Sequence, residues 1–166
     1  MLDSLQDQVY AGGARLRLDV TRCYAFNAAA KQQSGEKPDL SIPARITRLR
    51  EYLRNFKPPI VITFSAEAFV FAMRAMHDDA AGIPAHPKVA DLGRSFRDAI
   101  RNYDPELVNV FPLLHAYAAR GHWHTLGPVF SGSDDPDINY FEYAGRALGD
   151  VLLKHGRDLA IWCSAE

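Results

Sequence analysis

Three histidines lie close together in the second half of the chain, and their spacing could bind a metal ion. His122 and His124 flank Trp123, and His115 lies a short distance upstream. On an extended segment, an H-x-H pair places both imidazoles on one side, because strand side chains alternate with a period of two. With His115 as a third ligand and one open position, the rings would suit zinc, iron or manganese. A metal-dependent hydrolase that uses a His115/His122/His124 cluster is therefore one hypothesis for the function.

A structural explanation competes with the metal hypothesis. Residues 107–119 are almost all apolar, which predicts a central helix buried on all sides. His115 would lie in this helix, Pro112 would kink it, and Gly121 would end it. No HExxH, HxHxDH or second HxH motif supports a metal site. We therefore expect no cofactor, and a divalent metal is the alternative.

Motifs for nucleophilic catalysis and nucleotide binding are absent from the sequence. It contains no GxSxG, GxxxxGK[ST] or GxGxxG pattern. Ser65 follows an apolar run and begins a helical pattern, so we interpret it as a helix cap. Cys23 and Cys163 form no CxxC pair, and we expect both to be small core residues. No catalytic residue is assigned, and a role other than an enzyme is favoured.

A basic segment is the second candidate site. An apolar stripe at three- and four-residue spacing predicts a helix over residues 42–56, capped by Ser41 and stopped by Pro58. The basic residues of this segment are Arg45, Arg48, Arg50, Arg54 and Lys57, against Glu51 alone. Because the apolar stripe is intact, we expect these charges on the exposed side and flanks of the helix. Tyr52 and Phe56 add surface for stacking.

The basic helix supports our main functional hypothesis. Arginine forks bind carboxylates and phosphates in a bidentate manner. We therefore expect a small interaction or regulatory protein that binds an acidic protein surface or a nucleoprotein complex. A nucleic-acid-binding protein that uses the same helix is an alternative. A further alternative is that these charges form a solvated face paired with the acidic second half of the chain.

Composition and charge limit the remaining classes. The chain has 166 residues, of which 48% are hydrophobic, so one globular domain over residues 1–166 is expected. No apolar run approaches the roughly 18 residues of a membrane span, and the acidic start does not resemble a signal peptide. Two cysteines make no disulfide framework, so a cytoplasmic protein is expected. The pI near 6.6 argues against a dedicated nucleic-acid binder, although residues 1–60 carry ten basic and six acidic side chains.

The periodic patterns predict an α+β fold with helices in the majority. We expect five or six helices and a small sheet of about three strands, with a minimal α/β sheet as the alternative. The first expected strand runs from about residue 16 to roughly residue 26. The second covers residues 60–64, and the third closes the chain over residues 159–163. The expected helices cover 2–10, 42–56, 66–77, 88–103, 107–119 and 136–155. Asp104 with Pro105, and Asp135 with Pro136, are expected to begin two of them.

Overall fold

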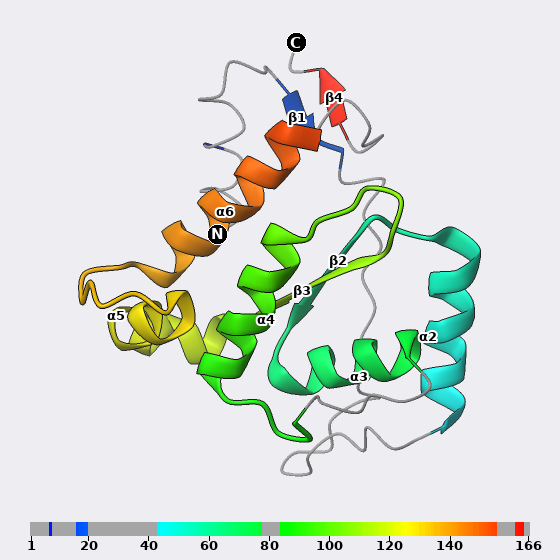
Figure 1. Cartoon of the computed structure of the whole chain (residues 1–166), viewed down its shortest axis with the longest axis horizontal. Helices are drawn as coiled ribbons and strands as arrows, with labels where there is room; N and C mark the ends of the chain where they lie inside the picture. Colours follow the sequence, from blue (N-terminus) through cyan, green and yellow to red (C-terminus); the bar gives the residue numbers. More distant parts are fainter. Residues whose placement is uncertain (1–6, 8–15, 20–42, 78–83, 156–161, 165–166) are drawn as a thin grey trace.

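The computed structural model describes residues 7, 16–19, 43–77, 84–155 and 162–164 (Figure 1). The helices of these ranges are α2 (Pro43–Phe56), α3 (Ala66–Met76), α4 (Val89–Arg101), α5 (Ala116–Ser131) and α6 (Tyr140–His155). The strands are β1 (Leu16–Leu18), β2 (Ile60–Phe64), β3 (Asn109–Leu113) and β4 (Trp162–Ser164). None of these helices is long and apolar enough to cross a bilayer. Only residue 7 of the helix expected over 2–10 is described, and the Ser41 cap and Cys23 lie outside the described residues.

The strands form two separate pairs. β2 and β3 are parallel, with a register that runs from Ile60 opposite Asn109 to Phe64 opposite Leu113. β1 and β4 are antiparallel, with Leu16 opposite Ser164. α3 packs against both strands of the parallel pair, and α4 packs against β3. The α+β class is confirmed, but the small sheet is divided into two pairs where the sequence analysis expected one sheet.

The helix expected over residues 107–119 is wrong. Its first part is strand β3, and α5 begins only at Ala116. A short, continuously apolar run fits a buried strand as well as a buried helix. Pro112 is tolerated because of the direction of its backbone nitrogen. Asn109 N–H donates to Pro59 O across the pair (3.2 Å), so by alternation the nitrogen of Pro112 faces away from β2 and no ladder bond is lost.

Side-chain caps fix the starts of two helices. Ser65 caps α3 as expected, and its Oγ accepts a hydrogen bond from Ala68 N–H (3.1 Å). The start expected at Pro136 is wrong, because Asn139 caps α6 and its Oδ1 accepts from Phe141 N–H (2.9 Å). Asp135 closes a turn before the helix by accepting from Asp137 N–H (3.0 Å). A short polar side chain can cap a helix or close a turn, so the sequence alone offers several starts here.

A turn takes the place of the helix expected after Asp104. The Asp104 carboxylate accepts a hydrogen bond from Glu106 N–H (2.9 Å). The Asn109 side chain holds this turn to the chain before β2, because its Nδ2 donates to Leu107 O and to Pro59 O (both 2.9 Å). The expected Asp-Pro helix start is therefore a tight turn that leads into β3.

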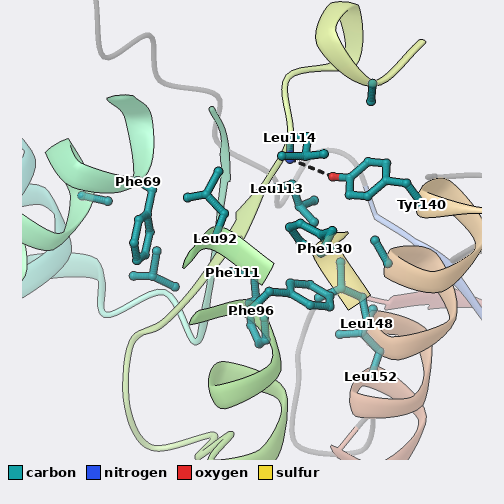
Figure 2. Packing of buried hydrophobic residues seen from close by; sticks show 14 residues of the cluster. Phe69, Leu92, Phe96, Phe111, Leu113, Leu114, Phe130, Tyr140, Leu148 and Leu152 are labelled. Atoms are coloured by element: carbon teal, nitrogen blue, oxygen red, sulfur yellow. Dashed lines mark hydrogen bonds between the residues drawn. The ribbon is translucent and has the colours of Figure 1, made fainter. Parts of the chain in front are cut away.

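An aromatic core joins α4, β3, α5 and α6 (Figure 2). Phe96 of α4 has no exposed surface, and its ring lies 6.2 Å from that of Phe111 and 5.3 Å from that of Phe130. Tyr140 is also buried, and its hydroxyl accepts a hydrogen bond from Leu114 N–H (2.7 Å). These contacts fix where β3 ends and α6 begins.

The backbones of α4 and α5 touch at one glycine. A Cβ on Gly93 would overlap the carbonyl group of Phe130. The side chain of Arg97, one turn further along α4, donates a hydrogen bond to the same carbonyl oxygen. Glycine at position 93 therefore permits the close helix packing that the core requires.

Candidate functional site

The basic helix α2 lies at the outside of the fold (Figure 1). It packs against α3, and Leu53 is the buried residue of its inner side. From the sequence, all five basic side chains are expected on the exposed side and flanks of this helix. In the structure Arg50 turns toward α3 and Arg45 is half-buried. The other three cations, Arg48, Arg54 and Lys57, are exposed.

Arg50 is turned toward the end of the neighbouring helix. Its Nε donates to Ala75 O and its Nη2 donates to Arg74 O, both at 3.0 Å. The last carbonyls of a helix have no partner within the helix, so a guanidinium that binds two of them acts as a C-terminal cap. Arg50 thus fastens α2 to α3, and we assign it a structural role.

Arg48, Arg54 and Lys57 are exposed and form the cationic part of the outer surface of α2. Glu51, also exposed, is the single carboxylate of this helix. Ion pairs occur within α4 and within α6, and among the described residues none includes these three cations. The expected neutralisation by the acidic second half of the chain is therefore not seen at these three residues.

The second arginine row, on α4, is arranged differently. Arg94 pairs with Asp91 (3.8 Å), and Arg101 pairs with Asp98 (2.9 Å). Both pairs join residues three apart on the helix, a spacing at which side chains meet. The α4 row largely neutralises itself, which makes it a natural control for α2.

Two aromatic rings lie on the same side of α2 as Arg48, because Arg48, Tyr52 and Phe56 are spaced four residues apart. The rings of Tyr52 and Phe56, one turn apart, have centroids 4.5 Å from each other. Tyr52 is half-buried, whereas Phe56 is 68% exposed. Hereafter the basic surface of α2 means Arg48, Arg54 and Lys57 together with these two rings.

The chain leaves α2 through an unusual backbone conformation. Lys57 has φ 42°, in the left-handed region, and its N–H still donates to Leu53 O (3.0 Å). A left-handed residue commonly ends a helix, and glycine is the usual residue because it has no Cβ. The proline that follows then directs the chain into β2.

Replacing Arg50 by alanine should lower the free energy of unfolding by about 1 kcal/mol, because two carbonyls of α3 lose their partner. Arg48→Ala is the matched control on the same helix, and it should stay within about 0.5 kcal/mol of the wild type. Urea unfolding of both variants measures the difference. Equal destabilisation by the two substitutions would contradict the structural role of Arg50.

The three histidines occupy the exposed surface of α5 and its start. His115 lies at the N-cap, not inside a buried helix, and its Nδ1 accepts a hydrogen bond from Tyr117 N–H (3.2 Å). His122 and His124 lie inside α5, so the extended segment expected for them is wrong, as is the helix end expected at Gly121. The break in the pattern is instead a kink at His122 (φ −134°, ψ 19°).

The helical placement changes what the histidines can do together. His122 is not extended (ψ 19°), so the H-x-H pair loses the shared side that a strand would give it. Among the described residues, no three His, Cys, Asp or Glu side chains are grouped so that they could hold a metal ion.

The carboxyl edge of the parallel pair is a feature that the sequence did not reveal. Phe64 and Leu113 end β2 and β3 side by side, so the caps Ser65 and His115 begin α3 and α5 at the same edge. Ligands of parallel sheets bind at such edges. The signal was hidden because β3 has the composition of a buried helix. Both polar side chains at this edge are engaged as helix caps.

The comparisons give this chain no relatives. No family model matches it, and neither a curated protein nor a solved structure matches it.

Proposed function

We propose that the protein binds an acidic protein partner through the basic surface of α2. One observation carries this proposal: three exposed cations on one short segment have no ion-pair partner in the described chain. Paired arginines of the same protein, on α4, show that its carboxylates do neutralise basic rows elsewhere. The contrast between the unpaired cations of α2 and the paired arginines of α4 supports binding of an external partner by α2.

The chemistry of the surface favours carboxylates as the bound groups. A guanidinium binds a carboxylate through two parallel hydrogen bonds, and an exposed ring beside it adds apolar contact. Exposed charge pairs contribute little each, and their main effects are on association rate and specificity. The net charge of −1 over the whole chain favours a protein partner over a nucleic acid, because a nucleic-acid binder usually carries a basic domain.

A charge reversal tests this proposal. The double variant Arg48→Glu/Arg54→Glu should bind a fluorescein-labelled, glutamate-rich peptide at low salt about tenfold more weakly than the wild type, a loss of about 1.4 kcal/mol. Fluorescence anisotropy measures the affinity. The matched control is Arg94→Glu/Arg101→Glu, which reverses two exposed arginines of α4 and should change the affinity much less.

Two results would overturn the proposal. One is an equal loss of affinity in both double variants, which would indicate a general response to net charge. The other is a single-stranded DNA oligonucleotide that binds more tightly than the peptide, with an affinity that falls steeply with salt, because that behaviour indicates a nucleic-acid binder.

A further inference from the structure

One side of α2 carries a cation and two adjoining rings in a single row. Arg48, Tyr52 and Phe56 are spaced four residues apart, so their side chains follow one another along the helix surface. Eight residues of helix separate Arg48 from Phe56 by about 12 Å along the helix axis. We call these three residues the α2 row. The row begins with an exposed charge and ends with an exposed ring.

The Tyr52 ring supports the Phe56 ring. The two ring centroids are 4.5 Å apart, with an angle of 33° between the ring planes. Tyr52 is half-buried, whereas Phe56 is 68% exposed. The contact therefore restricts the orientation of the Phe56 ring while most of its surface stays in water. A side chain that is already ordered loses little conformational entropy when a ligand covers it.

The other two exposed cations of the basic surface lie outside this row. Arg54 is two residues before Phe56, so the two side chains do not face each other. Lys57 follows the last residue of the helix. Glu51 is three residues from Arg48 and three from Arg54, so the two arginines share the same neighbouring carboxylate. Arg48 and Arg54 are thus alike in charge and exposure, and they differ in which of them shares a side of α2 with the rings.

We infer that the α2 row selects an acidic segment of the partner that also carries an apolar side chain. A carboxylate pairs with Arg48, and the apolar side chain covers the exposed surface of Phe56. About 12 Å separates the two contacts, which fits residues about four apart in an extended peptide. Aromatic side chains and arginine are enriched in the cores of protein interfaces, whereas lysine is depleted. This inference rests on the proposed function and makes it more specific.

Two labelled peptides test the inference by fluorescence anisotropy. Both are glutamate-rich, and they differ in one central residue, leucine or serine. Wild-type protein should bind the leucine peptide about fivefold more tightly, because the leucine leaves water when it covers the ring. Phe56→Ala should abolish this preference, and Phe56→Leu, which keeps an apolar side chain, should retain about twofold. Phe64→Ala, a change of a 46% exposed phenylalanine on β2, should preserve it in full.

A matched pair of arginine variants separates the row from the rest of the basic surface. Arg48→Ala and Arg54→Ala each remove one exposed arginine from the same helix. Arg48→Ala should reduce the leucine preference to about twofold, because contacts made by one ligand to neighbouring side chains are coupled. Arg54→Ala should weaken both peptides by the same factor and keep the fivefold preference, because Arg54 contributes only long-range attraction.

The outcomes separate this inference from the proposed function. Three results would overturn the inference alone, provided that Arg48→Glu/Arg54→Glu still weakens binding. They are equal affinities of the wild type for the two peptides, a leucine preference that survives Phe56→Ala, and a leucine preference that falls equally in Arg48→Ala and Arg54→Ala. Failure of both peptides to bind the wild type would overturn the proposed function and this inference with it.

Discussion

Replacing Phe96 by alanine is expected to lower the free energy of unfolding by about 3–5 kcal/mol. Phe96 has no exposed surface, and its ring is surrounded by those of Phe111, Phe130 and Tyr143, with centroids 5.3 to 6.2 Å away. These partners come from β3, α5 and α6. Alanine would therefore leave a cavity at the point where four elements meet, and the neighbours can collapse into it only in part.

Equilibrium urea unfolding measures this loss. Phe56→Ala is the matched control, because the same atoms are removed from a largely exposed ring, and it should cost less than about 1 kcal/mol. If the two variants were equally stable, the core could not lie between α4, β3 and α5 as the structure has it.

Replacing Tyr140 by phenylalanine is expected to lower stability at neutral pH by about 1–3 kcal/mol. The Tyr140 hydroxyl accepts a hydrogen bond from Leu114 N–H at 2.7 Å, and both residues are buried. Phenylalanine keeps the ring but leaves that N–H without its acceptor. Urea unfolding at pH 7 measures the cost, and the exposed Tyr117→Phe is the control, with little change expected. A loss below about 0.5 kcal/mol would contradict the assigned bond.

The same tyrosine predicts a dependence of stability on alkaline pH. Burial raises the pKa of Tyr140 from 10.0 to about 12, and the bond from Leu114 lowers it in part. Above pH 10 the unfolded chain loses this proton while the folded chain keeps it, so the contribution is present below pH 10 and is lost as the pH rises toward 12. The loss is about 3 kcal/mol in full. Tyr140→Phe should lack this component, and parallel stability curves for the two proteins would contradict it.

Periodicity and capping predicted the elements around the basic surface. The helical spacing of α2, the β-branched run of β2 and the cap at Ser65 each agree with the structure, although Phe56 at the end of α2 is 68% exposed. In these segments the local pattern has one interpretation: a spacing of three and four for a helix, or a short branched run between prolines and serine for a strand. Local and tertiary preferences coincide there, so the sequence alone was sufficient.

The secondary structure predicted for the segment from Leu107 to His124 was wrong. A continuous apolar run carries no period, so β3 and a buried helix could not be distinguished. Pro112 was assigned to a helix kink. The sequence does not show which strand lies beside this segment, and therefore does not show that the Pro112 nitrogen points away from it. Once β3 was missed, His115 was placed inside a helix that it in fact begins. The carboxyl edge of the parallel pair was lost for the same reason.

The candidate site was predicted as a segment, but not residue by residue. Composition identified the basic helix, and the spacing of its apolar stripe showed which side faces inward. The role of Arg50 depends on the end of α3, which lies distant in sequence and adjacent in space. The left-handed backbone of Lys57 depends on how the chain turns from α2 into β2. Such features arise from tertiary packing, which no local pattern encodes.

Amide chemical shifts, followed by NMR while the glutamate-rich peptide is added to the intact protein, test the central claim most directly. Partner binding at the basic surface of α2 predicts shift changes concentrated on residues 48–57. The amides of α5 from Ala116 to His124 should stay unchanged. Changes concentrated on α5, or none at any peptide concentration, would contradict the account.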